Sequence, residues 1–442
     1  MPSPIIWQNE AKDVTLIDIP RSIECAQGTT EIRHLQSTSP LEVPFLSNEP
    51  KSASGKARLQ QHDREDRLHE EYRSLLNAAL EEIRGAFPKA WCLPRPFTNE
   101  STPHQSKKRK LTHDVDGFKT KVQPTQAIET GGRGALSDRS IQDHADDGEA
   151  VTSTGGYRTR VSFDAEERRV FSNTSDQPTT IYIPGNGDSE EHRHSFNIPP
   201  GSSFYLGDCA DAKPLRDAVR DRARQADSTH LFNFILLDPP WPNSSVKRTH
   251  HTPSSTYATS PSLWDLREML LDTKIELLMA EECLIGVWIT NKPAVRELVL
   301  HDDGLFACWG VQLVEEWAWL KTTIHGEPVS PLDAVWRKPY EVLLLGRKRR
   351  KVAAPDDAEV KTSNVQRKVM LAVPDLHSRK PCLKELIEPM MPDPKRYRAL
   401  EVFARYLVAG WWSWGNECIK FNWECYWQKE CEKPEKLALA NG

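Results

Sequence analysis

The sequence predicts an α/β protein with a central, mainly parallel sheet, and two observations indicate it. Strand-like apolar runs alternate with helical runs between about residues 204 and 346, as in layered α/β domains. In addition, 12 of the 14 tryptophans of this 442-residue chain lie at or after Trp241. Only 38% of all residues are hydrophobic, below the roughly 45–50% of globular domains. Core-forming residues are therefore concentrated in the second half.

The alternation assigns residues 204–430 to one α/β domain. We expect a disordered insert near residues 350–366 and a charged tail at 431–442. The runs interpreted as strands or helices are, in order, FNFILLDPPW (232–241), LWDLREMLLDTKIELLMAE (263–281), CLIGVWIT (283–290), KPAVRELVLHD (292–302), VEEWAWLKT (314–322) and YEVLLLGR (340–347).

The first half of the chain is predicted to be less structured. Residues 1–54 show no sustained hydrophobic period, so we expect a poorly structured N-terminus. Residues 55–92 are assigned to an amphipathic helix that ends at Gly85 and Pro88. Its apolar stripe recurs at spacings of three and four residues and comprises Leu68, Tyr72, Leu75, Leu76, Ala79 and Ile83.

Two further segments precede the α/β domain. Residues 93–155 are rich in Ser, Thr, Gly, Asp and Lys and nearly lack aromatics, which predicts a disordered linker. Residues 156–203 contain short β-branched or aromatic runs between turn residues, which predicts a small antiparallel accessory module that binds nucleic acid. Its strand arginines either face phosphates or only aid solubility; they are Arg158, Arg160, Arg168 and Arg169.

Two basic runs suggest where the protein acts. SKKRK (106–110) and RKRRK (347–351) are typical of nuclear import signals, so we expect a nuclear protein, with the cytoplasm as an additional location. The same runs also fit phosphate-attracting tethers or solvated charge.

Charge, hydropathy and cysteine content narrow the function classes. The net charge of -5 excludes a globally basic, histone-like binder but leaves local basic patches open. No window of about 18 uncharged apolar residues occurs and the start lacks a secretory signal, so we expect no membrane association. The nine cysteines include no C-x-x-C pair, which argues against a disulfide framework and a metal site.

The informative segment is DPPW (238–241), directly after a buried-type strand. Ligands of open α/β sheets bind at the carboxyl ends of strands. Asp238 can accept one hydrogen of an exocyclic amine, the rigid prolines leave the carbonyl of Pro239 free to accept the second, and Trp241 offers a face for base stacking. Two acceptors would draw a delocalised adenine amine toward tetrahedral geometry and favour its attack on an electrophilic methyl group. The alternative is a simple strand-to-loop turn.

These residues resemble the MT-A family of adenine-N6 methyltransferases, with the closest likeness to its methyltransferase-like four clade. The resemblance runs from about residue 203 to residue 427 and implies a Rossmann-like methyltransferase fold in permuted order. The chain has no G-x-G-x-x-G fingerprint, and LEVFAR takes that place by resemblance. The motifs, in family order, are DPPW (238–241), NSSVKRTHH (243–251), KPYEVLLLGR (338–347), LHSRKP (376–381), LEVFAR (400–405) and SWGNECIKF (413–421).

The resemblance implies S-adenosylmethionine as cofactor and a role for each matched residue. The catalytic motif is Asp238, Pro239, Pro240 and Trp241. The implied cofactor-binding residues are Asp208, Lys338, Ser378, Arg379, Lys380, Arg405, Asn416 and Glu417, with arginine at 379 where the family usually has histidine. The implied substrate-binding residues, which would hold a phosphate beside the target, are Asn243, Ser245, Lys247 and Arg248.

Three functions remain open at this stage. The first is methylation of adenine N6 in RNA, for which the clade implies a small nuclear RNA and 2′-O-methyladenosine. The second is the same reaction on DNA, and the third is a catalytically inactive, nucleic-acid-binding partner subunit. In the enzymatic hypotheses the target adenine is unpaired or flipped, and we expect the protein to act as a monomer.

Overall fold

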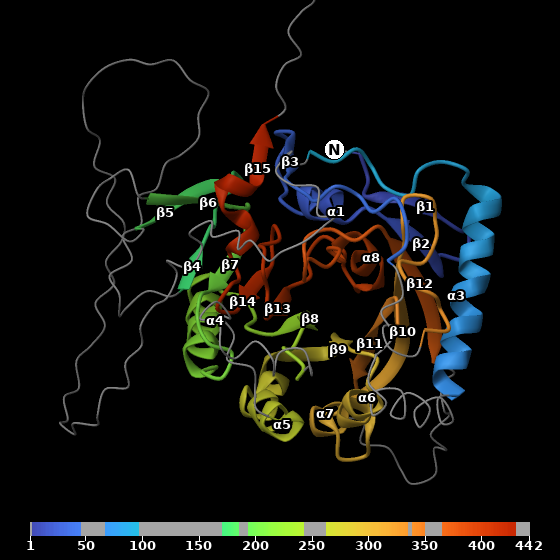
Figure 1. The fold of residues 1–442 in the computed structure, drawn as a ribbon. Coiled ribbons are helices and arrows are strands. Elements are labelled where there is room, and N and C mark those ends of the chain that lie inside the picture. Colours follow the sequence, from blue (N-terminus) through green and yellow to red (C-terminus); the bar gives the residue numbers. More distant parts are fainter. Residues whose placement is uncertain are drawn as a thin grey trace, which may run out of the picture.

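The computed structural model describes residues 2–45, 67–96, 170–184, 193–242, 262–334, 338–349 and 365–429. Within these residues an 11-stranded sheet forms the centre of the fold (Figure 1). From edge to edge its strands are β1 (Ile5–Gln8), β2 (Val14–Ile17), β12 (Gln366–Ala372), β10 (Val311–Lys321), β11 (Tyr340–Lys348), β9 (Met279–Ile289), β8 (Phe232–Leu237), β13 (Ala399–Val402), β14 (Trp412–Trp414), β7 (Ser203–Tyr205) and β4 (Val170–Ser172).

The central strands are mainly parallel, as predicted. β7, β14, β13, β8 and β9 are parallel neighbours, whereas β11 runs antiparallel to both β9 and β10. These parallel strands and β10 therefore end at one edge of the sheet, where β11 begins. We call it the carboxyl edge. The predicted α/β class is confirmed.

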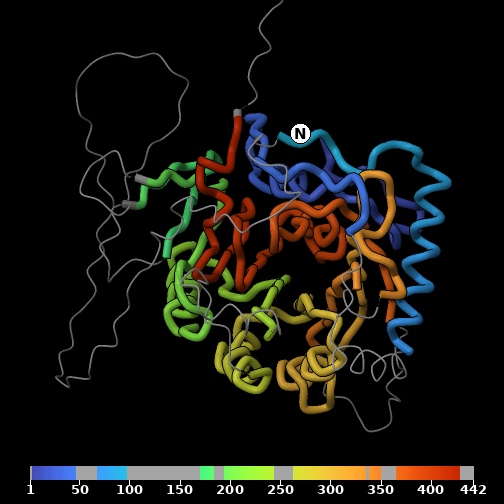
Figure 2. Tube along the Cα trace, in the orientation of Figure 1, coloured from blue at the N-terminus to red at the C-terminus, as the bar shows by residue number. Residues whose placement is uncertain are grey.

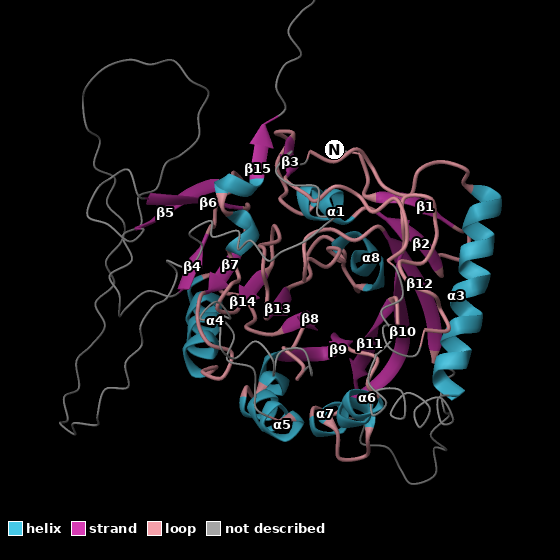
Figure 3. Cartoon of the chain, viewed as in Figure 1, coloured by secondary structure: helices cyan, strands magenta, loops and turns pink. Residues whose placement is uncertain are grey.

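Helices cover both faces of the sheet (Figure 3). On one face, here the α4 face, Ile235 and Leu237 of β8 belong to a hydrophobic core to which five helices contribute. The other, the α8 face, packs Phe234 and Leu236 against α1 (Ile19–Cys25) and α8 (Lys384–Ile387). Alternate side chains of β8 thus enter opposite layers, as a pleated strand requires. The helices on the α4 face are α3 (Arg67–Ala86), α4 (Lys213–Gln225), α5 (Leu263–Asp272), α6 (Pro293–Leu300) and α7 (Leu305–Cys308).

The N-terminal residues are part of the fold, so the expectation of a poorly structured segment at 1–54 is wrong for residues 2–45. β2 pairs in parallel with β12, and β1 extends the sheet beyond it. Figure 2 shows this blue segment beside the orange strands. Its short apolar runs need no helical period because they only extend a sheet that the rest of the chain forms. Asp18 caps α1 by accepting from the backbone N–H of Arg21 at 3.0 Å.

Helix α3 confirms the predicted amphipathic helix, although it is described only from Arg67 to Ala86. Most of the stripe residues are buried, among them Leu76 and Ile83. Tyr72 donates its hydroxyl hydrogen to Oε2 of Glu316 on β10 at 2.7 Å, a buried polar contact that fixes the helix on the sheet. The rest of the predicted range before Arg67 lies outside the described residues.

The segment predicted as a β-rich module does form antiparallel strands, but it is not separate from the α/β domain. β4 and β7 belong to the main sheet. β5 (Thr179–Pro184) and β6 (Arg193–Ile198) form a hairpin whose buried residues pack with Leu407 and Cys418. The four strand arginines of the prediction lie outside the described residues. The apolar sides of these short strands are therefore buried by the C-terminal segment.

The remaining elements are short. β3 (Arg33–Leu35) pairs antiparallel with β15 (Trp427–Lys429). Trp411, Trp412 and Trp414 are buried core residues. No helix in the described part of the chain is long and apolar enough to cross a membrane. The 3-10 helices are η4 (Ile275–Leu278), η5 (Glu388–Met390), η6 (Lys420–Asn422) and η7 (Glu424–Tyr426).

Two of the five residues of the second basic run have structural roles. Arg347 and Lys348 lie in β11, where Arg347 donates to the carbonyl of Glu282 at 3.1 Å and Lys348 to that of Met279 at 2.9 Å. Both side chains thus serve the sheet, which disfavours an import signal at this position. SKKRK and the predicted linker and insert lie largely outside the described residues.

Candidate active site

Asp238 lies at the carboxyl edge, directly after β8. Its backbone N–H donates to the carbonyl of Val402 on β13 at 3.4 Å, which ties the start of DPPW to the neighbouring strand. Oδ1 of Asp238 lies 3.0 Å from Nζ of Lys380, and the Asp238 side chain is 25% exposed. The acid therefore reaches solvent while one oxygen is paired.

Lys380 links Asp238 to two residues of the antiparallel part of the sheet. Its ammonium also lies 3.0 Å from Oε2 of Glu341, near the start of β11. Oε1 of Glu341 in turn lies 2.5 Å from Nζ of Lys321, the last residue of β10. Positive and negative groups thus alternate along the carboxyl edge. We call Lys321, Glu341, Lys380 and Asp238 the charged row.

The alternation favours the charged forms of Glu341 and Lys380. Burial alone would raise the pKa of Glu341, but Lys380 and then Lys321 outweigh it and lower this pKa to about 2. Burial would likewise lower the pKa of Lys380, and the two carboxylates of Asp238 and Glu341 instead raise it. Asp238 therefore always faces a cation at neutral pH.

The prolines of DPPW lead into a tight turn. The backbone N–H of Trp241 donates to the carbonyl of Pro239 at 2.8 Å, so the expectation that this carbonyl is free is wrong. A carbonyl oxygen has two lone pairs, and one remains for a further donor. Pro239 is buried and Pro240 is partly exposed. Pro239 can thus still accept an amine hydrogen beside Asp238.

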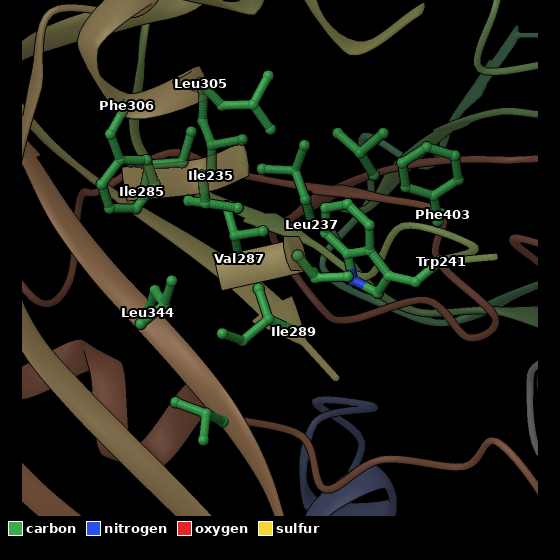
Figure 4. Close-up of a cluster of buried hydrophobic side chains, with 14 of the residues drawn as sticks. Ile235, Leu237, Trp241, Ile285, Val287, Ile289, Leu305, Phe306, Leu344 and Phe403 are labelled. Carbon is green, nitrogen blue, oxygen red and sulfur yellow. The ribbon is translucent and has the colours of Figure 1, made fainter. Parts of the chain in front are cut away.

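Trp241 is a core residue. Its side chain is only 6% exposed, and its Nε1 donates to the carbonyl of Trp288 at 2.7 Å. Figure 4 shows the indole among Leu237, Ile289 and Phe403 on the α4 face. The prediction that a base stacks on Trp241 is wrong, because the ring is enclosed in the core. It instead anchors the turn that follows Asp238.

Substitutions at Trp241 should act on stability. Trp241→Ala leaves a large cavity and is expected to lower the free energy of unfolding by about 3–5 kcal/mol. Trp241→Phe retains much of the packing but loses the hydrogen bond to Trp288, so we expect a loss of about 1–2 kcal/mol. Urea denaturation measures both values. Wild-type stability in both variants would contradict the core position.

A second polar group follows β13 and β14 at the same edge. Nη1 of Arg405 donates to the carbonyl of Ser378 at 3.1 Å, and Nε of Arg405 lies 3.5 Å from Oε2 of Glu417. Nζ of Lys420 contacts Oε1 of Glu417 at 3.0 Å. Asn416 directly precedes Glu417 and is partly exposed. The structure thus brings together Ser378, Arg405, Asn416 and Glu417, four of the residues that the sequence suggested for cofactor binding.

Two non-glycine residues of this region have left-handed backbone. Phe403, directly after β13, has φ 62°, and Ser378 has φ 68°. Such conformations cost about 1–3 kcal/mol in non-glycine residues and cluster at ligand sites. Phe403 makes the sharp turn after the strand for which nucleotide-binding loops commonly use glycine. This explains how the chain forms a strand-to-loop turn here without the glycine-rich fingerprint.

Two other predicted cofactor-binding residues lie at the carboxyl edge, but they belong neither to the charged row nor to the polar group around Glu417. Asp208 follows β7, is exposed, and accepts from the backbone N–H of Ala210 at 2.9 Å. Lys338 lies just before β11 and is partly exposed. The predicted substrate-binding residues Asn243, Ser245, Lys247 and Arg248 lie outside the described residues.

Arg379 is buried among protein groups, so the expectation that it contacts cofactor or substrate is wrong. It is 2% exposed. Its Nη1 contacts Oδ2 of Asp375 at 2.5 Å and donates to the carbonyl of Gln36 at 2.9 Å. The guanidinium also lies 4.2 Å from the centre of the Phe421 ring. Arg379 thus holds the LHSRKP loop against the N-terminal segment and C-terminal region.

Three charged residues of the site were not predicted from the sequence: Lys321, Glu341 and Glu401. Each is a charged residue within or next to a strongly apolar strand, and that contrast was the available signal. Glu401 is buried on β13, and no described residue forms an ion pair with it. Burial and the nearby Asp238 raise its pKa to about 8, although Lys380 and Arg405 oppose the shift.

The raised pKa of Glu401 predicts a pH-dependent stability. Between the ordinary value of 4.5 and about 8, the folded protein holds a proton that the unfolded chain has released. The stabilisation is therefore complete below about pH 4.5 and is lost as the pH rises to about 8, by about 1 kcal/mol per pH unit. Glu401→Gln should abolish this slope. Denaturation at about pH 5 and about pH 8 measures it, and an unchanged slope in the variant would contradict the assignment.

The fold and the charged row define an α/β protein with a polar ligand site at the carboxyl edge of its sheet. A family model described as MT-A70 matches residues 232–417, from β8 to Glu417. The N6-methyladenosine RNA methyltransferase MTA1 of Pyricularia oryzae is 31% identical over 449 residues, 97% of each chain. The chain belongs to the MT-A70 family, which confirms the resemblance inferred from its motifs.

Two further relatives match about half of the chain. The N(6)-adenine-specific methyltransferase METTL4 of Homo sapiens is 36% identical over 256 residues, 57% of this chain and 48% of that protein. The DNA N6-methyl methyltransferase of Caenorhabditis elegans is 32% identical over 230 residues, 50% of this chain and 53% of that protein. The relatives therefore include proteins named for RNA and for DNA.

Proposed function

We propose that this protein transfers a methyl group from S-adenosylmethionine to N6 of adenine in nucleic acid, and in RNA rather than DNA. The observation that carries the proposal is Asp238 at the carboxyl edge, paired with Lys380 and followed by the rigid turn of DPPW. Membership of the MT-A70 family supports the reaction, and the relative matched over almost the whole chain is named for RNA.

In this mechanism the chain's own residues bind and orient the amine. Oδ1 of Asp238 is paired with Lys380, so its other oxygen is the acceptor for one N6 hydrogen. The carbonyl of Pro239 accepts the second hydrogen with its remaining lone pair. Lys380, itself held by Glu341, fixes the orientation of the Asp238 carboxylate. Two fixed acceptors favour a tetrahedral amine, and no reorganisation is needed during the reaction. The amine nitrogen would bond to the methyl carbon as the donor's C–S bond breaks, and the proton lost from nitrogen would pass to Asp238 or to water.

The polar residues after β13 and β14 fit a nucleoside cofactor. Asn416 and Glu417 supply amide and carboxylate oxygens that can accept from ribose hydroxyls, and Arg405 fixes Glu417. Asp208 lies at the same edge, where it can meet an adenine ring. When bound, S-adenosylmethionine supplies a methyl group made electrophilic by its sulfonium. Phe403 gives the backbone turn that lets a ligand approach the end of β13.

We further propose that the domain is a Rossmann-like methyltransferase in permuted order. β8 and β13 are parallel neighbours in the sheet, and β8, which Asp238 directly follows, comes before β13 in the chain. Strands β7, β14, β13, β8 and β9 supply the parallel half, and β11 is the reversed strand inserted between β9 and β10. We also propose that the protein acts as a monomer and that it acts in the nucleus.

A direct assay separates the candidate functions. Purified protein receives labelled methyl donor with matched RNA and DNA oligonucleotides, each single- and double-stranded, beside Asp238→Ala as control. We expect N6-methyladenine on unpaired RNA and none with the variant; a parallel series with 2′-O-methyladenosine tests the finer substrate. Preference for DNA would favour the DNA methyltransferase alternative, which the Caenorhabditis elegans relative supports. No transfer to either polymer would favour an inactive partner subunit.

A further inference from the structure

Glu401 is a buried carboxyl group next to the catalytic acid, and the mechanism above does not use it. On β13 it is in register with Leu236 of β8 and with Ser413 of β14. Leu236 packs on the α8 face, and Asp238 follows it by two residues, so Asp238 and Glu401 project on the same side of the sheet. Diagonal neighbours of this kind lie about 7–8 Å apart, within reach of long side chains.

The surroundings of Glu401 leave it without a compensating charge of its own. The charged groups near it are Asp238 after β8, Lys380 in the loop before α8, and Arg405 after β13. Lys380 is already shared by Asp238 and Glu341, and Arg405 is engaged by Glu417. The remaining neighbours on these elements are buried Cys382, Tyr406 and Cys418, all with pKa values raised by burial and therefore neutral at working pH.

A charge on Glu401 would disturb the charged row. The row is electrically balanced, with two lysines and two carboxylates. A third carboxylate would compete for Lys380 and repel Asp238, and it would be 8% exposed, with little water to solvate it. Ser413, its neighbour on β14, is buried and its hydroxyl has no hydrogen-bond partner among the described residues, so it offers a polar contact to a protonated carboxyl.

We propose that Glu401 is a positioning residue that must stay uncharged for Lys380 to hold Asp238 in place, so that its ionisation at alkaline pH turns the enzyme off. This inference rests on the proposed function. The raised pKa of about 8 agrees with it and sets the range in which activity is lost. Neither Lys380 nor Glu341 titrates in that range, because the pKa of Lys380 is raised and the pKa of Glu341 is lowered.

The test is the pH dependence of kcat for the wild type, Glu401→Gln and Glu401→Asp. The substrate is an oligonucleotide of adenosine and cytidine only, whose bases do not ionise at alkaline pH, with donor and oligonucleotide saturating. From about pH 7 to about pH 9 we expect kcat of the wild type to fall about tenfold. For Glu401→Gln the fall should be under about twofold, because glutamine cannot ionise. Glu401→Asp should retain the fall with a shifted midpoint.

The donor has an amine that also titrates near neutral pH, but it is common to all three proteins, so only their difference is assigned to Glu401. The same alkaline fall in wild type and Glu401→Gln would overturn the inference and leave the proposed function intact. A Gln variant reduced by one factor at every pH would show a merely structural role and would also overturn it. A wild type that transfers no methyl group overturns both.

Discussion

Asp238→Asn is expected to lower kcat for methyl transfer to adenine about 1,000-fold. Asparagine keeps the shape of the side chain but loses the negative charge, and its amide can present hydrogens to the incoming amine. Removal of one preorganised partner of this kind commonly costs a factor of 10²–10³. The rate is measured under single-turnover conditions with saturating donor, so that donor binding does not enter the comparison.

The matched control is Asp217→Asn. Asp217 is also paired with a lysine, Lys213 at 2.5 Å, but it lies on the exposed side of α4 and its side chain is 46% exposed. Such a surface pair contributes at most about 1 kcal/mol to stability, and we expect wild-type turnover. If Asp238→Asn kept the wild-type rate, Asp238 would not be the group that holds the amine.

Lys380→Met is expected to lower kcat about 100-fold and to destabilise the fold by about 3 kcal/mol. The substitution leaves the carboxylate of Asp238 unpaired and takes one of the two lysines from Glu341, at a position where the lysine side chain is only 16% exposed. Glu341 keeps its ion pair with Lys321, whereas Asp238 loses its ion pair with Lys380. Lys380→Arg restores the charge and should recover part of the rate.

Lys368→Met provides the comparison for Lys380→Met. Lys368 pairs with Glu315 at 2.9 Å and lies 5.2 Å from the ring centre of Trp317, much as Lys380 lies 5.3 Å from that of Trp288. It shares the ion pair and the aromatic contact but lies away from Asp238. We expect a modest stability loss and no loss of kcat. Equal losses of kcat in the two variants would contradict the role of the charged row.

Much of the site could be predicted from sequence because its motifs lie at the ends of strands. Asp238 and Arg405 directly follow apolar runs, and the ends of parallel strands meet at one edge. Lys380 came from family resemblance, and the structure adds that it bridges two carboxylates. The partners of Glu341 could not be predicted, because the antiparallel register of β10 and β11 brings Lys321 to it and Lys380 reaches it from the loop before α8.

The wrong predictions of site residues have a common cause. Residue type suggested a ligand contact for side chains that the fold buries in the protein. Trp241 follows a catalytic acid, but its indole fills the core on the α4 face. Arg379 stands in a ligand-binding motif, but it points inward to Asp375. The N-terminal strands were missed because residues 5–8 and 14–17 are too short to show a period, and they become ordered by joining a sheet built mostly from the second half.

The most direct test of the central claim is a crystal structure with S-adenosylhomocysteine and an adenosine-containing oligonucleotide. The account predicts the adenine N6 atom about 3 Å from both a carboxylate oxygen of Asp238 and the carbonyl oxygen of Pro239, with Lys380 still on the other carboxylate oxygen. An adenine bound elsewhere, with both oxygens of Asp238 taken by Lys380, would contradict it.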